Sequence, residues 1–187
     1  MNWKIISAVF IALTIIFAGA FIGVYYLDSS AIAKEKKQLE VNDTNELATE
    51  HWNQIAIENQ SLIMKQYAGN ATLNWIGGPL NGTYHGTSAI NTTWGKFFTA
   101  WQAVWFYAST GTTSNPIVTV NGSTATITAN FTQFVVQSSS THDFEYINTT
   151  YTLVYYNMDH STNNNVDYKI VDETFHITGS GKLSSLE

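Results

Sequence analysis

GTYHGTSAINTTWGKFFTAW, residues 82–101, holds a strand, a glycine and a helix from which the fold can be worked out. Thr83–His85 is a short extended segment that follows the turn-forming residues 77–82. Thr87 suits the N-cap of a helix that we expect to run to about residue 101. Its apolar side chains recur at spacings of three and four, which is typical of one helical face: Ile90, Trp94, Phe97, Phe98 and Trp101.

The segments on either side of this stretch complete an α+β pattern. Before it, residues 46–67 carry one apolar helical face, Gly69 and Asn70 are expected to end that helix, and residues 71–76 alternate as a strand. After it, five segments rich in Val, Ile, Thr, Tyr and Phe predict strands at 102–109, 116–120, 124–136, 144–158 and 168–178. We therefore expect a curved antiparallel sheet wrapped around helices.

The alternation is clearest at the start of the strand predicted over residues 124–136. An Asn121-Gly122 turn precedes it, as is typical of a hairpin. Its polar side chains should face water and the apolar ones between them should face the core: Thr124, Thr126, Thr128, Asn130 and Thr132 on one side, and Ala125, Ile127, Ala129 and Phe131 on the other.

Four short motifs in this order resemble the nuclear transport factor 2-like superfamily, and within it the SnoaL-like and ketosteroid-isomerase-like branch. They are Tyr67-Ala-Gly-Asn-Ala-Thr-Leu73, Gly82-Thr-Tyr-His-Gly86 with Ser88-Ala-Ile90 and Phe97-Phe98, Val120-Asn-Gly-Ser-Thr-Ala125, and Tyr168-Lys-Ile170. The resemblance covers about residues 46–180 and implies a cystatin-like cone with an apolar pocket at its open mouth. It also implies that an enzyme of this kind uses a pocket carboxylate or histidine as general base, whereas other branches use the outer sheet face to bind partners.

The amino-terminal part of the chain predicts a membrane segment. Residues 5–27 contain no charge and are long enough for one transmembrane helix, which residues 28–45 would follow as a polar stalk. A cleaved signal peptide is the other interpretation, because small residues at 18–20 follow a shorter apolar run. The predicted organisation is an anchor or signal peptide at 1–27, the stalk, a domain at 46–180 and a tail at 181–187.

Eight Asn-x-Ser/Thr sequons favour an extracytoplasmic domain carrying N-linked glycans. The predicted location is the cell membrane, with a single pass and the carboxyl-terminal domain outside, or a secreted protein if the amino-terminal segment is cleaved. The lysines at 34, 36 and 37 follow the apolar run and favour the opposite orientation. The candidate acceptors are Asn42, Asn59, Asn70, Asn81, Asn91, Asn121, Asn130 and Asn148.

The composition excludes several classes of function. Charged residues make up 12% of the 187 residues, the net charge is −6, and no arginine is present, so nucleic-acid binding is excluded. Without cysteine there is no disulfide framework or thiolate chemistry. Abundant Ser, Thr and Asn supply most of the polarity, which is similar to the surface proteins of acidophilic archaea.

The candidate catalytic residues are Asp172, His176 and His85. Asp172 and His176 should share a strand face with Tyr168, so Asp172 would be the general base if that face lines the cone. If the face points to solvent instead, Val171, Phe175 and Ile177 would lie in the core. The short motif at 142–145 lacks a third metal ligand at a recognised spacing, so we expect neither a metal nor a cofactor.

Aromatic side chains could line a pocket for a small apolar or sugar-like ligand, or they could simply form the core. They are Trp75, Trp94, Trp101, Trp105, Tyr107, Tyr151 and Tyr155.

Three functions remain open from the sequence. The favoured one is a membrane-anchored binding or surface-assembly module, because no convincing acid–base pair can be recognised, and this leans away from an enzyme. The second is a small-molecule isomerase, cyclase or dehydratase. The third is a structural subunit of a surface filament or layer, for which a homo-oligomer is expected.

Overall fold

The computed structural model describes residues 3–108, 116–137, 144–159 and 167–182. For residues 3–29, 102–108, 134–137 and 144 it describes the backbone alone. The chain divides into two compact units, Met1–Leu39 and Glu40–Glu187.

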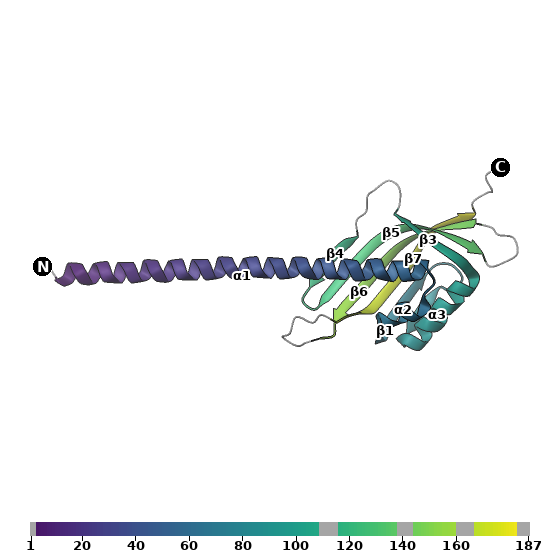
Figure 1. Cartoon of the computed structure of the whole chain (residues 1–187), viewed down its shortest axis with the longest axis horizontal. Helices are drawn as coiled ribbons and strands as arrows, with labels where there is room; N and C mark the ends of the chain where they lie inside the picture. The colour runs from purple at the N-terminus through teal and green to yellow at the C-terminus, as the bar shows by residue number, and fades with distance from the viewer. Residues whose placement is uncertain (1–2, 109–115, 138–143, 160–166, 183–187) are drawn as a thin grey trace. The chain divides into compact units, whose positions relative to one another are not determined.

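The second unit combines helices with one seven-stranded sheet, which confirms the α+β class (Figure 1). The sheet order is β2-β1-β7-β6-β5-β3, and β4 pairs with β5 outside this path. All neighbouring strands are antiparallel except β1 and β7. The elements are α1 (Trp3–Ala56), α2 (Gln60–Lys65), β1 (Tyr67–Ile76), β2 (Gly82–His85), α3 (Gly86–Ala100), β3 (Trp101–Ala108), β4 (Ile117–Asn121), β5 (Thr124–Gln137), β6 (Phe144–Asn157) and β7 (Tyr168–Lys182).

The first unit consists of the amino-terminal part of α1, which continues without a break through residues 28–45. In the part of the chain with described side chains, no helix combines the length and apolarity that a membrane crossing needs. The predicted membrane segment, residues 5–27, lies outside that part.

The helix predicted over residues 46–67 is two helices, because the chain turns at Glu58, whose φ is 59°. Asn59 then caps α2 by accepting a hydrogen bond from the Leu62 backbone N–H at 3.2 Å. The expectation that Gly69 and Asn70 end the helix is wrong, since both lie inside β1.

The alternation predicted for β5 is confirmed. Ala125, Ile127 and Ala129 are buried, and the threonines between them are half-exposed. The Asn121-Gly122 turn joins β4 to β5, with Gly122 at a φ of 61°, which a residue with a side chain rarely adopts. The buried positions 125, 127 and 129 of β5 belong to the inner face of the sheet.

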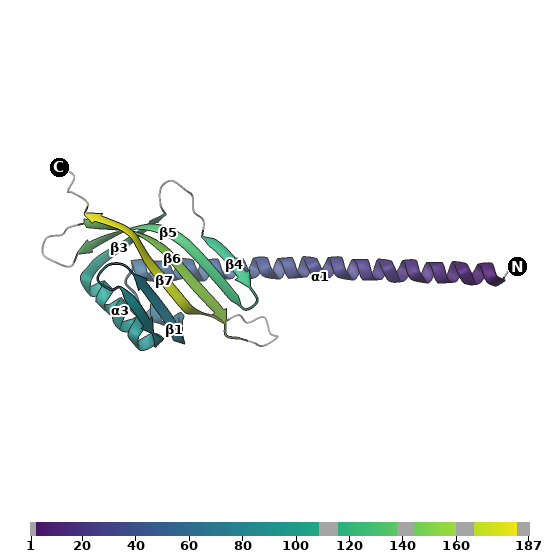
Figure 2. The same ribbon diagram turned by 180° about the vertical axis from the view of Figure 1, so that it is seen from behind.

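The three helices of the second unit pack on the inner face of the sheet, which both ribbon views allow the reader to follow (Figures 1 and 2). The contacts are mostly aromatic. Trp52 of α1 lies with its ring centroid 6.2 Å from that of Tyr151 of β6. Trp94 of α3 lies 5.6 Å from Trp75 of β1, which in turn lies 4.2 Å from Phe175 of β7.

β7 changes phase along its length because one residue is inserted. Ile170 pairs with Tyr155 and Asp172 pairs with Val154, so Val171 has no counterpart on β6. Such a bulge moves every later side chain to the opposite face. Tyr168 and Ile170 are buried before the bulge, and Glu173 and Phe175 are buried after it.

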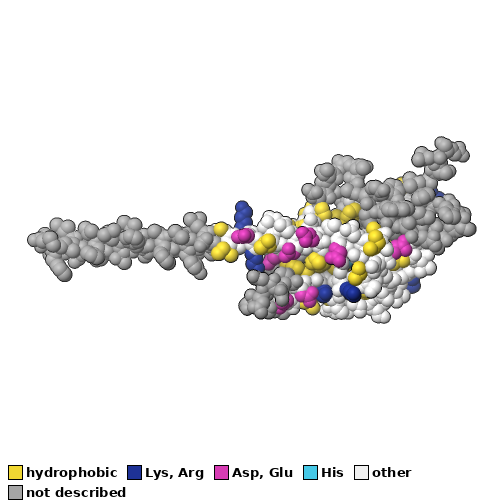
Figure 3. All heavy atoms as spheres, viewed as in Figure 1, with side chains coloured by type: hydrophobic (Ala, Val, Ile, Leu, Met, Phe, Trp, Pro, Cys, Tyr) yellow, Lys and Arg dark blue, Asp and Glu magenta, His cyan; other side chains and the backbone are white. Residues whose placement is uncertain are grey.

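Charged side chains are few on the molecular face shown in Figure 3, where most of the described surface is backbone or uncharged polar side chains. This agrees with the low charge and the abundant Ser, Thr and Asn of the sequence.

Candidate active site

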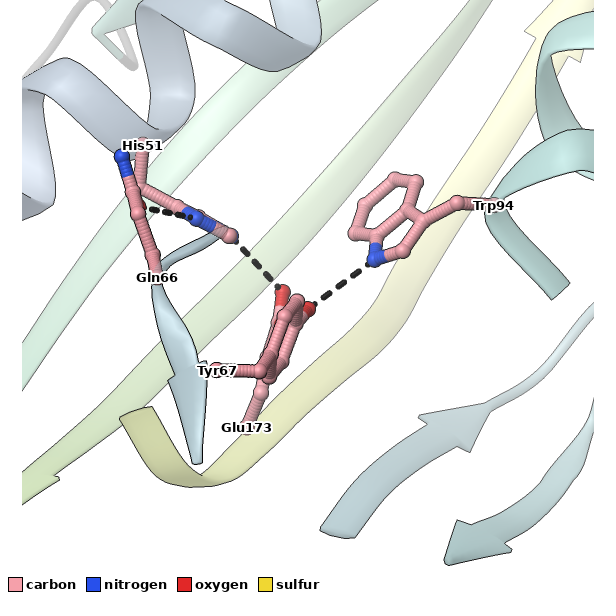
Figure 4. A network of polar contacts seen from close by, with 5 residues as sticks. All are labelled: His51, Gln66, Tyr67, Trp94 and Glu173. Carbon is pink, nitrogen blue, oxygen red and sulfur yellow. Dashed lines mark hydrogen bonds and ion pairs between the residues drawn. The ribbon is translucent and has the colours of Figure 1, made fainter. Parts of the chain in front are cut away.

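Five polar side chains meet beneath the helices, on the inner face of the sheet, four of them from different helices and strands (Figure 4). His51 comes from α1, Tyr67 from β1, Trp94 from α3 and Glu173 from β7, while Gln66 lies between α2 and β1. His51 and Glu173 are both completely buried. A histidine and a carboxylate are rarely buried together without a specific partner for each.

Glu173 is held through both of its carboxylate oxygens. The Tyr67 hydroxyl donates to Oε2 in a short hydrogen bond, and His51 Nε2 lies 3.4 Å from Oε1. The indole N–H of Trp94 donates to the Tyr67 oxygen at 2.9 Å, so the Tyr67 proton is directed at the carboxylate. The network therefore fixes the orientation of Glu173 from two sides.

His51 is oriented through its other nitrogen. Nδ1 lies 2.7 Å from Gln66 Oε1, so Nδ1 carries a proton and donates it to the amide oxygen. Nε2 then faces Glu173 Oε1 across 3.4 Å. Two side chains that can each carry a proton thus face each other in the interior.

Three tyrosines surround the carboxylate, and each has its pKa raised above the ordinary value by burial and then by the nearby charge of Glu173. Tyr67 is hydrogen-bonded, as described above. The Tyr155 hydroxyl is buried and makes no hydrogen bond with the described residues. The Tyr151 hydroxyl lies near enough to Glu173 for hydrogen bonding to add to the rise of its pKa. All three remain neutral phenols, able to donate a hydrogen bond.

The sequence-predicted catalytic residues lie elsewhere. Because of the bulge at Val171, Asp172 faces the outer side of the sheet, where its carboxylate accepts from Asn74 Nδ2 at 3.2 Å. His176 is exposed, and His85 is exposed at the end of β2 with Nδ1 3.2 Å from Thr72 Oγ1. Asp172 and His85 share one row across β7, β1 and β2, but neither faces the interior.

The solvent-facing alternative for this segment is right only in part. Phe175 is fully buried, as that alternative requires, but Val171 and Ile177 are half-exposed and Tyr168 and Ile170 are buried. Burial lifts the pKa of Asp172, with Asn74 opposing the shift and Glu173 adding to it. The carboxyl group with this raised pKa lies on the outer face of the sheet, away from His51.

Five of the seven predicted aromatic residues belong to the buried core of the second unit: Trp75, Trp94, Trp101, Tyr151 and Tyr155. The side chains of Trp105 and Tyr107 lie outside the described residues, as does His142 of the rejected metal motif. Two of this buried set lie next to His51, because the His51 ring centroid is 6.5 Å from those of both Trp94 and Tyr151.

The sequon asparagines occupy different settings. Asn121 is exposed at the β4–β5 turn. Asn130 and Asn148 lie within strands, and each accepts a hydrogen bond from the threonine of the other's sequon. Thr150 donates to Asn130 Oδ1 at 2.7 Å, and Thr132 donates to Asn148 Oδ1 at 2.9 Å.

Sequence reasoning missed His51, Tyr67 and Glu173 as polar groups of the interior. A signal existed for His51, because it lies with Ala48, Trp52 and Ile55 at helical spacing on the apolar face of α1. Glu173 gave no comparable signal, since plain alternation along β7 assigns it to the face opposite Ile170.

No protein-family model matches the chain, and no curated protein matches it. Solved structures do match. A scytalone dehydratase-type protein of Novosphingobium aromaticivorans has a TM-score of 0.64 at 10% identity, over 81% of this chain and 92% of its own. A nuclear transport factor 2-like superfamily protein of Salmonella enterica has a TM-score of 0.56 at 15% identity, over 78% of this chain and 97% of its own. The second unit has the nuclear transport factor 2-like fold.

A third structure with this nuclear transport factor 2-like fold is a type 3 hexachlorocyclohexane dehydrochlorinase of Novosphingobium barchaimii, with a TM-score of 0.57 at 13% identity over 78% of this chain and 97% of its own. At such identities the likeness concerns the fold alone. The superfamily resemblance seen in the sequence is therefore confirmed at the level of fold.

Proposed function

We propose that the chain is a small-molecule lyase or isomerase that transfers a proton through the buried His51–Glu173 pair. The observation that carries the proposal is the complete burial of this pair among aromatic side chains. A binding module was favoured from the sequence because no acid–base pair could be recognised. His51 and Glu173, which face each other across 3.4 Å, are such a pair, so the argument against an enzyme no longer applies.

Stability alone is a weak explanation for such a pair. Taking two ionisable groups out of water is unfavourable, and replacing a buried ion pair by apolar residues is often neutral or stabilising. The burial of two of the few ionisable side chains of this protein therefore points to a role other than stability. Solved structures of the same fold include a hexachlorocyclohexane dehydrochlorinase and a scytalone dehydratase-type protein, whose names denote elimination of hydrogen chloride and of water.

In the proposed reaction Glu173 removes a proton from a substrate carbon, and the imidazole of His51 supplies a proton to a leaving hydroxyl or to another atom of the substrate. Gln66 keeps Nδ1 protonated and so sets which nitrogen faces Glu173. Tyr67 holds the carboxylate in place. General acid–base catalysis of this kind contributes about 10²–10⁴-fold to a rate.

The test is elimination of water from a panel of β-hydroxy ketones, followed by the absorbance of the conjugated product. Glu173→Gln and His51→Gln should each lower kcat by about 10²–10⁴-fold. Asp172→Asn, which changes the neighbouring carboxylate on the outer face, should leave the rate unchanged. Equal activity of the Glu173→Gln protein and the unmodified protein would overturn the proposal.

For the cellular setting we propose a membrane anchor at residues 5–27, with the domain outside the cytoplasm and carrying N-linked glycans. The uncharged run and the eight sequons support this. The full chain should stay with membranes after alkaline carbonate extraction, and a chain that begins at residue 28 should be released. Glycosidase treatment should increase the electrophoretic mobility of the protein. Release of the full chain by carbonate would contradict the anchor.

A further inference from the structure

The tryptophan side chains that the structure describes are all buried in the core, but their indole N–H groups differ. Those of Trp52, Trp75 and Trp101 have no partner within the described part of the chain. Trp94 instead donates to the Tyr67 oxygen at 2.9 Å (Figure 4). An indole N–H can only donate, so this hydrogen bond has one possible direction. The contribution of α3 to the polar network is therefore a donor whose direction is fixed.

The Trp94 ring is held in place by aromatic neighbours on α3 and β1. It is fully buried, with its centroid 5.6 Å from those of Trp75 and Phe97 and 5.7 Å from that of Phe98, on which it stacks. Close packing on several sides favours a single rotamer. The position of the indole N–H is thus set by the packing of α3 on the sheet.

Tyr67 carries this constraint on to Glu173. Its oxygen accepts from Trp94, and its single proton is donated to Glu173 Oε2. If a protonated Glu173 donated to Tyr67 instead, the tyrosine proton would have no acceptor in the network. Oε2 is therefore kept as an acceptor. A proton taken up by Glu173 then belongs on Oε1, which lies 3.4 Å from His51 Nε2.

The other titratable groups near Glu173 impose no such direction. Tyr151 and Tyr155 project from β6, and the pKa of each is raised by burial and then by the charge of Glu173, with hydrogen bonding to Glu173 adding to the rise for Tyr151. Within the described part of the chain no side chain donates to either hydroxyl, so neither proton is directed from behind. Asp172 lies on the opposite face of the sheet, and His51 faces Oε1.

We propose that Trp94 is a positioning residue of the proposed enzyme, which acts through Tyr67 to keep Oε2 of Glu173 as an acceptor and to leave Oε1 as the oxygen that takes up the proton. This role rests on the proposed function, in which Glu173 is the base. A hydrogen bond received by the Tyr67 oxygen polarises its O–H group and strengthens the bond that it donates. Trp94 thus favours the charged form of Glu173, although α3 brings no charge to it, since Lys96, the one charged residue of α3, is exposed.

The test is the pH dependence of hydrogen exchange between cyclohexanone and D2O, catalysed by the full chain in a non-ionic detergent. The quantity compared is the pH at which the rate is half-maximal on the acid side. Trp94→Phe should raise this midpoint by about half a pH unit, because the charged base is stabilised less. Tyr67→Phe, which removes the donor itself, should raise it by about one pH unit or more. Trp75→Phe is the matched control: it removes a buried indole N–H that has no partner in the described residues, so the midpoint should not move.

A second measurement does not depend on whether Trp94→Phe folds. In an isotope-labelled chain, the NMR signal of the Trp94 indole N–H should move with pH over the same range as the rate, and the Trp75 signal should move much less. In Glu173→Gln the Trp94 signal should no longer move.

Equal midpoints for Trp94→Phe and Trp75→Phe would overturn the inference, as would a Trp94 signal that does not respond to pH in an active chain. The proposed function fails separately, if Glu173→Gln exchanges cyclohexanone as fast as the unmodified protein. A Trp94 signal that follows pH only while Glu173 is present would even then support the hydrogen-bond arrangement.

Discussion

The two halves of the buried pair should depend on each other for stability. Glu173→Leu removes the partner of His51 Nε2, 3.4 Å away, and the acceptor of the Tyr67 hydroxyl. Removing one member of a buried ion pair costs about 3–5 kcal/mol, and a lost hydrogen bond to a charged group about 1.5–3 kcal/mol. Because these two effects overlap, we expect a loss of about 4 kcal/mol for Glu173→Leu and about 3 kcal/mol for His51→Leu.

The double variant should be no less stable than either single one, because neither His51 nor Glu173 is left as an unpaired buried charge. It still leaves Gln66 and Tyr67 without a partner, which costs about 3 kcal/mol, so the coupling between the two sites is about 4 kcal/mol. Urea unfolding of the full chain, followed by tryptophan fluorescence, measures this. At a slope of roughly 2 kcal/mol per molar urea, Glu173→Leu lowers the midpoint by about 2 M. Additive effects within about 0.5 kcal/mol would refute the pairing.

Three further predictions use the same unfolding assay. Tyr67→Phe leaves the Trp94 indole N–H and one Glu173 oxygen unpaired and should cost about 3 kcal/mol; a loss below 1 kcal/mol would contradict the network. Burial raises the pKa of the interior tyrosines, so the folded state binds their protons more tightly than the unfolded state. These tyrosines should therefore leave stability unchanged below about pH 10 and lower it above that by about 1.4 kcal/mol per pH unit for each of them, with a shallower fall in Tyr155→Phe. The raised pKa of Asp172 means that its charged form is unfavourable in the folded state. Asp172→Asn removes this charge, so the variant should be at least as stable as the unmodified protein at pH 7. The difference should vanish below about pH 4, where Asp172 is protonated in both the folded and the unfolded state.

Local patterns in the sequence were sufficient for the order of the elements. Alternation in residues 124–132 predicted the two faces of β5, and the spacing from Ile90 to Phe97 predicted the buried face of α3. Both patterns depend only on neighbours along the chain. The motifs that span the domain led to the correct fold for the same reason, because they record where strands, turns and helices follow one another.

The site depends on features that local patterns do not record. The inserted residue at Val171 reverses the faces of β7, so alternation pointed to Asp172 where the structure buries Glu173. A bulge is set by pairing with β6 and β1, which lie far away in the sequence. Likewise, His51 and Glu173 are 122 residues apart, and their contact exists only after α1 has packed on the sheet.

Exchange of carbon-bound hydrogen with solvent tests the central claim most directly, because it needs neither a leaving group nor the natural substrate. Cyclohexanone would be incubated with the full chain in D2O, and loss of its α-proton signals would be followed by NMR. If the His51–Glu173 pair transfers protons, the unmodified protein should accelerate exchange over buffer, and Glu173→Gln should reduce this acceleration at least 100-fold while Asp172→Asn retains it. Exchange that is equally fast with Glu173→Gln would contradict the account.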